Sequence, residues 1–238
     1  MDQPARRSRL SRIQDHLKQI IYGGNDGIVT TFAIVAGFAG ANAEGVAQIG
    51  GLAVLVFGLA NLFADAVSMG LGEYLSTRSA HDLYRTRRRA RIAAVKTQTE
   101  AEIVSLSETL VAKGLPQPEA QTVARSLAQN PKILAETQMM YQQGIRPPEN
   151  DHPALNGMVT FLSFVLFGGL PLLPYILRDA DERSFTLSAL ATCLALTALG
   201  VLRWLATGDR FRVSVMETVG VGLVCAIVAY LVGWLVGG

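Results

Sequence analysis

AQIGGLAVLVFGLANLFADAVSMGLGEYL, residues 47–75, contains only two charged side chains, Asp65 and Glu73. Because roughly 20 apolar residues of α-helix cross the ~30 Å core of a bilayer, this stretch is long enough to span a membrane. The polar residues that follow, STRSAHDLYRTRRRAR (76–91), include no glycine or proline. We therefore predict that the helix of this span continues beyond the membrane without a break.

Four other stretches of the chain are also long and apolar, at about 27–43, 155–177, 185–206 and 213–237. The first of them is short for a span unless its helix begins before residue 27. Of the 238 residues, 50% are hydrophobic and 17% are charged, whereas about 25% are charged in a typical soluble domain. This composition excludes a disordered chain and an ordinary soluble enzyme. We predict an all-α integral membrane protein with five transmembrane helices.

The polar segment between the second and third spans is predicted to form a small cytoplasmic domain. Gly114-Leu115-Pro116 and Asn130-Pro131 interrupt it, so we expect three helices, near 95–113, 117–129 and 131–144. The chain then divides into four parts: a basic amphipathic N-terminal arm (1–22), transmembrane helices 1 and 2 (23–86), a three-helix cytoplasmic domain (87–150) and transmembrane helices 3 to 5 (151–238).

The basic residues predict the orientation of the chain. With a cytoplasmic N-terminus, the arm, the insert and the loop at 203–212 lie inside and hold 19 of the 21 Lys and Arg residues. Cytoplasmic loops are rich in Lys and Arg, so we expect the C-terminus outside. The arm has apolar residues at helical spacing, which indicate a helix on the inner membrane face: Leu10, Ile13, Leu17, Ile20 and Ile21. The short termini of the chain favour a bacterial inner membrane over a vacuolar or other endomembrane.

Ionisable residues within spans are functional candidates, because each costs about 2.5–3.5 kcal/mol to insert. The candidates here are Asp26, Asp65, Glu73 and Glu217. In the second span, Asn61, Asp65, Met69 and Glu73 follow one another at intervals of four residues. Since 3.6 residues make a helical turn, these side chains form one stripe along the helix. We interpret the stripe as a polar track through the membrane.

Some of these positions also have a structural interpretation. Glu73 lies near the inner interface, where water or Arg78 could neutralise it. Asn25 or Asp26 could cap a helix that begins at Gly27.

Glu217, near the inner end of the fifth span, could equally have a structural role, as the partner of Arg203 or Arg212 in an ion pair.

The other candidates combine carboxylates with the thioether of Met69. Carboxylates bind hard divalent cations, and thioether sulfur favours softer ones. The mixture indicates a first-row transition metal in preference to Mg²⁺ or Ca²⁺, and the same carboxylates can exchange a metal ion for protons.

Four stretches resemble the vacuolar iron transporter family: GGNDGIVTTFAIVAGFAGA (23–41), GLANLFADAVSMGLGEYLSTRS (58–79), GGLPLLPYIL (168–177) and METVGVGLVCAIVAYLVGW (216–234). The resemblance implies a five-span homodimer with the transport path between its subunits and a cytoplasmic metal-binding domain. It also implies export of cytosolic Fe²⁺, and often Mn²⁺, in exchange for protons. Asp26, Met69 and Glu73 match positions that line the family's pathway, whereas Asp65 is inferred from the stripe.

The resemblance further implies metal ligands in the cytoplasmic domain, where this chain departs from the family pattern. The candidates are Glu100, Glu102 and Glu108 on the first helix and Glu136, Met139 and Met140 on the third. The last three lie at i, i+3 and i+4 and so share one helix face. Gln143 stands where the family has a glutamate after the Met pair, and this thinned set predicts weaker or altered metal capture.

We therefore predict a proton-coupled transporter that exports Fe²⁺ and/or Mn²⁺ from the cytosol. Its partners are these ions, protons, the lipid bilayer and a second copy of the chain; no permanently bound cofactor and no nucleic acid are expected. The alternative is a membrane-anchored metal buffer or sensor, which does not need carboxylates inside its spans. No nucleophile–base pair or phosphate-binding glycine loop points to an enzyme.

Overall fold

The computed structural model describes residues 14–41, 47–148, 152–178 and 182–237. Every regular element in these ranges is a helix, so the predicted all-α class is confirmed. The chain forms two compact units. We call Met1–Tyr74 with Pro153–Gly238 the apolar unit, and Leu75–His152 the inserted unit. The 51-residue helix α3 (Ala47–Thr97) contributes to both, which confirms that the second span continues as one helix.

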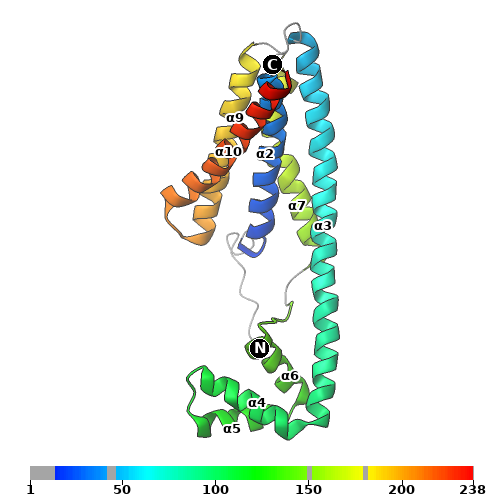
Figure 1. The fold of residues 1–238 in the computed structure, drawn as a ribbon, viewed down its shortest axis with the longest axis vertical. Coiled ribbons are helices and arrows are strands. Elements are labelled where there is room, and N and C mark those ends of the chain that lie inside the picture. The colour runs from blue at the N-terminus through cyan, green and yellow to red at the C-terminus, as the bar shows by residue number, and fades with distance from the viewer. Residues whose placement is uncertain (1–13, 42–46, 149–151, 179–181, 238) are drawn as a thin grey trace, which may run out of the picture. The chain divides into compact units, whose positions relative to one another are not determined.

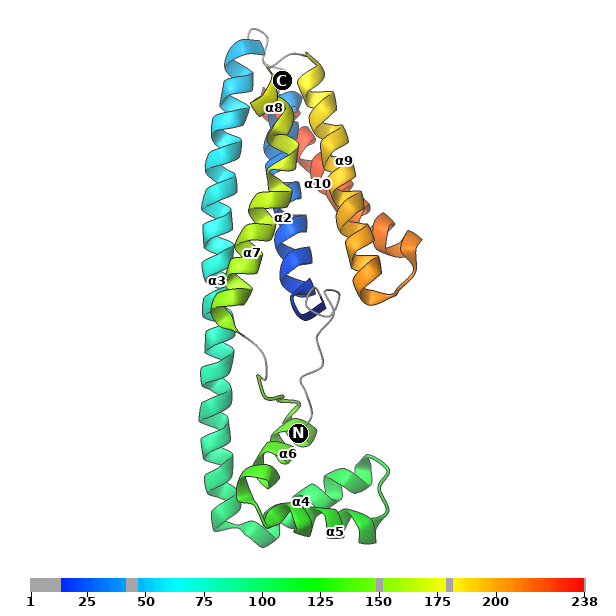
Figure 2. The same cartoon turned by 180° about the vertical axis from the view of Figure 1, so that it is seen from behind.

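The apolar unit is built around α2 (Leu17–Gly40). This helix packs against α7 (Pro153–Gly168), α9 (Glu182–Thr207) and α10 (Phe211–Gly237), as Figure 1 shows. After α7 the prolines of GGLPLLPYIL interrupt the regular α-helix, because proline lacks a backbone N–H. A 3₁₀ turn (Leu170–Leu172) and the short α8 (Leu173–Leu177) follow, visible in the reverse view of Figure 2.

Four helical stretches in the described part of the chain are long and apolar enough to cross a membrane. They are Gly51–Thr97, Pro153–Leu177, Arg183–Thr207 and Phe211–Gly237. These stretches support a multi-pass membrane protein. The helix α2 is not among them, because Asn25, Asp26 and several glycines lower its hydropathy, although its 24 residues are enough to span a bilayer. A fifth span therefore stays a prediction.

The helix α2 begins ten residues earlier than its apolar stretch, at Leu17. Leu17, Ile20 and Ile21, predicted to belong to an amphipathic arm, lie in its first turns. Leu10 and Ile13 lie outside the described residues.

Glycine allows α2 and α7 to approach closely. A Cβ atom at Gly27 would lie 2.5 Å from the carbonyl oxygen of Phe164, so a larger residue there would push the two helices apart. Small residues at such crossings allow the close van der Waals packing that joins helices in a bilayer.

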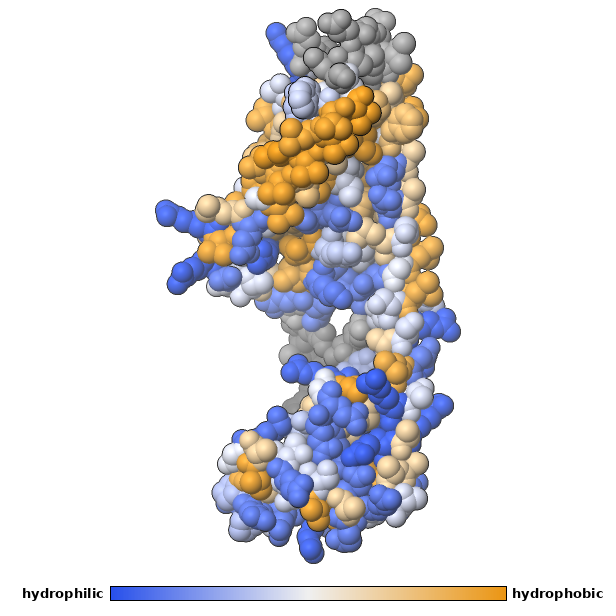
Figure 3. Space-filling view, in the orientation of Figure 1, coloured by the Kyte–Doolittle hydropathy of each residue, from blue (hydrophilic) through white to orange (hydrophobic). Residues whose placement is uncertain are grey.

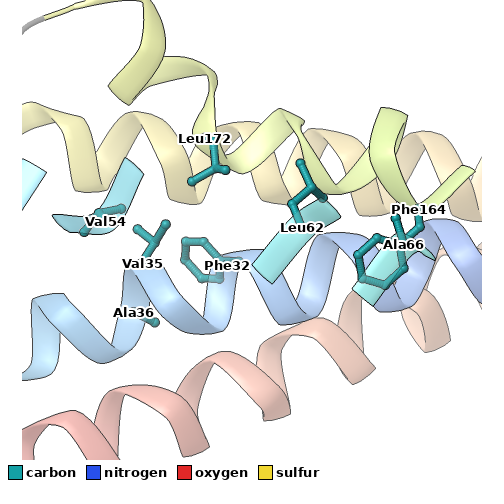
Figure 4. Packing of buried hydrophobic residues seen from close by; sticks show 8 residues of the cluster. All are labelled: Phe32, Val35, Ala36, Val54, Leu62, Ala66, Phe164 and Leu172. Atoms are coloured by element: carbon teal, nitrogen blue, oxygen red, sulfur yellow. The ribbon is translucent and has the colours of Figure 1, made fainter. Parts of the chain in front are cut away.

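The core of the apolar unit lies where α2, α3, α7 and the 3₁₀ turn meet. Figure 4 shows its buried side chains, which are Phe32, Val35, Ala36, Val54, Leu62, Ala66, Phe164 and Leu172. The Phe32 ring stacks on that of Phe185 from α9, with ring centroids 6.2 Å apart. Large apolar side chains also cover the outer surface of α10 (Figure 3), as expected for a helix that faces lipid.

The inserted unit contains the C-terminal part of α3 and three shorter helices. These are α4 (Thr99–Ala112), α5 (Gln117–Ala128) and α6 (Pro131–Gln143), close to the predicted ranges. The side chain of Asn130 caps α6 by accepting a hydrogen bond from the Lys132 backbone N–H at 3.1 Å. Gly144 ends the same helix with φ of 67°, a conformation that glycine adopts readily. The unit has its own buried core of Val95, Ile103, Leu106, Ala124, Leu134 and Ala135.

Candidate functional site

The stripe predicted on the second span lies on α3. Asn61, Asp65, Met69 and Glu73 are all half-buried there. Nδ2 of Asn61 donates a hydrogen bond to Oδ2 of Asp65 at 2.8 Å, so the spacing of four residues produces a direct contact. Met69 packs against the apolar core cluster. The stripe therefore combines carboxylate, amide and thioether groups beside a well-packed core.

Glu73, at the C-terminal end of the stripe, is held by a residue of α2. Its Oε1 accepts a hydrogen bond from Nε2 of Gln19 at 2.8 Å. Gln19 is only 7% exposed. A hydrogen bond to an ionised carboxylate is stronger than one between neutral groups, so Gln19 fixes the position of Glu73. The sequence-based prediction missed Gln19, although a polar residue inside LKQII (17–21) was a usable signal.

Asp26 lies in the third turn of α2 and not at its start. The helix begins at Leu17 with His16 as its N-cap residue, so the interpretation of Asp26 as the cap of a helix beginning at Gly27 is wrong. The carboxylate of Asp26 is close enough to that of Asp65 on α3 for the two charges to interact. Two like charges repel each other, and a cation close to both of them relieves the repulsion.

The interactions between α2 and α3 lie at two levels. Gln19 donates a hydrogen bond to Glu73 at one level, and Asp26 is within electrostatic range of Asp65 at the other. The helices therefore run antiparallel here. At a rise of 1.5 Å per residue, the two levels lie about 10–12 Å apart along the helices. The three carboxylates and Met69 thus form a track across about a third of a bilayer core.

Glu217 has a basic partner within the apolar unit. Its Oε2 lies 2.8 Å from Nη2 of Arg203, which joins α10 to α9. Of the two partners considered from the sequence, the contact is therefore with Arg203. This ion pair lines a cavity of about 780 Å³ together with Lys18, Asn25 and Asp26. The charge of Glu217 is balanced from inside the protein.

The six predicted ligands of the inserted unit have different surroundings. Glu100 and Glu108 are exposed on α4. Met139 is fully buried in the unit's interior, whereas Met140 is 39% exposed. Although they share a helix and one turn, the two sulfur-containing side chains of the Met pair therefore have different accessibility.

The two remaining glutamates among the six predicted ligands contact arginines of α3. Glu102 pairs with Arg91 at 2.6 Å, and Oε1 of Glu136 accepts from Nε of Arg88 at 2.6 Å. Among the residues that the structure describes, no three His, Cys, Asp or Glu side chains gather closely enough to hold a metal ion. Metal binding by these residues stays a prediction.

Comparison with known proteins identifies the family. A model of the VIT family matches residues 17–234. Vacuolar iron transporter 2 of Oryza sativa subsp. japonica is 32% identical over 214 residues, which cover 90% of this chain and 85% of that protein. The vacuolar iron transporter of Plasmodium berghei (strain Anka) is 30% identical over 233 residues, which cover 93% of this chain and 82% of that protein. The chain therefore belongs to the VIT family.

Proposed function

We propose that the protein is a proton-coupled transporter that exports Fe²⁺ and/or Mn²⁺ from the cytosol. The observation that carries the proposal is that the half-buried carboxylates of Asp65 and Glu73 lie on one stripe of α3, where hydrogen bonds from Asn61 and Gln19 hold them. Each carboxylate alone is expensive to insert into a membrane. A fold that keeps both is suited to a divalent cation that neutralises them. The relatives' names, vacuolar iron transporters, support iron as the cargo.

The chemistry of the track favours a transition metal. Carboxylates alone would suit Mg²⁺ or Ca²⁺ equally well, but the thioether of Met69 lies between Glu73 and Asp65 on the same helix stripe. Thioether sulfur is a ligand for softer ions. We propose that cargo enters at Glu73, passes Met69 and leaves past Asp65 and Asp26.

Proton coupling follows from the same groups. After a buried carboxylate has released its metal ion, protonation stabilises it, because burial disfavours the charged form of a carboxyl group. We propose that protons entering from outside displace the cargo from the carboxylates of the track and so reset it. In the proposed orientation, with the N-terminus inside, 19 of the 21 basic residues face the cytosol. We further propose a homodimer in a bacterial inner membrane.

The test is metal uptake into proteoliposomes under a pH gradient, with Fe²⁺ and Mn²⁺ measured in parallel. Asp26→Asn and Met69→Ala are compared with wild type, and Glu119→Gln on the exposed surface of α5 is the matched control. We expect gradient-driven uptake that the first two substitutions abolish and the control retains. Metal that binds to the purified protein but never crosses the membrane would instead establish the buffer or sensor.

A further inference from the structure

The guanidinium group of Arg91 lies among oxygen atoms of two other helices in the inserted unit. Its Nη2 is 2.6 Å from Oε2 of Glu102 on α4. Its Nε donates to Oε1 of Gln138 at 3.1 Å, and its Nη2 donates to Oε1 of Gln142 at 3.4 Å, both on α6. One carboxylate and two amide oxygens therefore converge on a single positive charge.

Hydrogen bonds elsewhere in the unit orient these oxygen atoms. The Nε2 of Gln138 donates to the Oε2 and the backbone oxygen of Glu102, at 2.9 and 3.0 Å. The Nε2 of Gln142 donates to the hydroxyls of Ser105 and Thr109, at 3.0 and 3.1 Å. Because both amide nitrogens are engaged, both amide oxygens are directed to Arg91. The arrangement is thus pre-organised for a cation.

The residues of this site are largely buried. Gln138 is fully buried, and the side chains of Glu102 and Arg91 are 11% and 23% exposed. Oxygen ligands of this kind, a carboxylate with amide carbonyls, are those that hard divalent cations prefer. A metal ion entering here would meet the fixed positive charge of Arg91 at short range, where repulsion is strong because little water screens it.

A second arginine, one turn away on α3, also contacts a glutamate of the inserted unit. Nε of Arg88 donates to Oε1 of Glu136 at 2.6 Å. Arg88 and Arg91 lie three residues apart and so share a face of α3. Of the four glutamates predicted as ligands, Glu102 and Glu136 are the least exposed. Arginines of the same chain neutralise both of them.

We propose that Arg91 is a built-in cation that fills a divalent-cation site formed by Glu102, Gln138 and Gln142. The inserted unit then keeps its structure without metal and captures no cargo, in contrast to the role predicted from the sequence. Removal of the guanidinium converts the site into one that binds a divalent cation such as Mn²⁺. The inference rests on contacts within the inserted unit and is independent of the proposed transport.

The experiment uses the full-length protein in detergent, with Mn²⁺ alone as the probe. Electron paramagnetic resonance measures the concentration of free Mn²⁺, and hydrogen exchange in peptides from α4 and α6 locates the bound ion. The variants are Arg91→Ala, Arg91→Met and Arg91→Ala/Glu102→Gln. Arg89→Ala, an exposed arginine on the same helix, is the matched control. Metal bound in the apolar unit is common to all of them and cancels in the comparison, so failure of transport leaves this result readable.

Both single Arg91 variants are expected to bind an additional Mn²⁺ ion per chain. Exchange in α4 and α6 should slow about tenfold when free Mn²⁺ is ten times its dissociation constant. The double variant loses this gain, and Arg89→Ala behaves as wild type. Protection of α4 and α6 by Mn²⁺ in the wild type overturns the proposal, as does a folded Arg91→Met variant without added binding. If either Arg91 variant unfolds, the other and the wild-type measurement still decide.

Discussion

Asp65 of the apolar unit and the two arginine-bound glutamates of the inserted unit have different electrostatic surroundings. In the inserted unit, Glu102 and Glu136 each contact an arginine of α3. In the apolar unit, Asp65 accepts from the neutral amide of Asn61 and interacts with a second carboxylate, Asp26. A charge balanced by the chain itself stabilises structure, whereas a charge balanced by another ion can bind and release that ion. Acidic residues alone therefore do not identify a metal path.

The largest expected effect comes from making the apolar unit resemble the inserted unit. Asn61→Lys places a built-in cation beside Asp65, where Nδ2 of Asn61 now lies 2.8 Å from the carboxylate. A fixed unit charge at about 4 Å repels a divalent ion by several kcal/mol, so we expect transport to fall at least about 100-fold. Proteoliposome uptake measures it, and Asn61→Gln, which preserves the amide, is the control. Unchanged uptake by a folded Asn61→Lys protein contradicts the path through Asp65.

The second effect concerns the stability of the inserted unit. Glu102→Ala leaves the charge of Arg91 buried without its carboxylate, which costs about 3 kcal/mol in similar pairs. We expect faster hydrogen exchange in α4 and α6 of this variant. Glu102→Leu combined with Arg91→Met removes both charges and should recover most of the loss. Equal exchange in Glu102→Ala and wild type would show that the pair contributes nothing.

A third variant separates positioning from binding in the apolar unit. Gln19→Leu removes the hydrogen bond that holds Glu73. Bonds to charged groups contribute about 1.5–3 kcal/mol, so we expect roughly tenfold slower transport with the helices intact. Gln14→Leu is the control, because it loses a bond of similar length, to the Ala206 carbonyl at 2.9 Å, and leaves Glu73 untouched. Equal slowing by both variants would assign the effect to general loosening of α2.

The smallest expected effect is at the ion pair between Arg203 and Glu217 in the apolar unit. Arg203 and Glu217 are 33% and 54% exposed, and exposed ion pairs contribute about 0–1 kcal/mol. Glu217→Gln should therefore change transport by no more than about twofold and leave thermal unfolding nearly unchanged. Loss of transport in this variant would mean that Glu217 belongs to the path, and that the pair with Arg203 opens during the cycle.

Much of the fold was predictable because it depends on local signals. The prolines and glycines that flank α5 and α6 stop helices wherever they occur, so these helices lie close to their expected ranges. The stripe on α3 was predictable for the same reason, since residues four apart are neighbours on any α-helix. The error at Asp26 had a local cause too. An Asn-Asp-Gly sequence resembles a helix start, but the helix continues through it because α2 is packed on several sides.

Local sequence patterns are enough to predict the helices, their apolar runs and the spacing of Asn61, Asp65, Met69 and Glu73. Which partner each carboxylate has depends on how the helices pack together. Gln19 for Glu73 and Arg91 for Glu102 are contacts between helices far apart in the chain or separated by a turn. The physical reason is that such contacts depend on the relative register and rotation of packed helices, which side-chain packing across the whole unit sets. The spacing of residues within one helix does not predict that register.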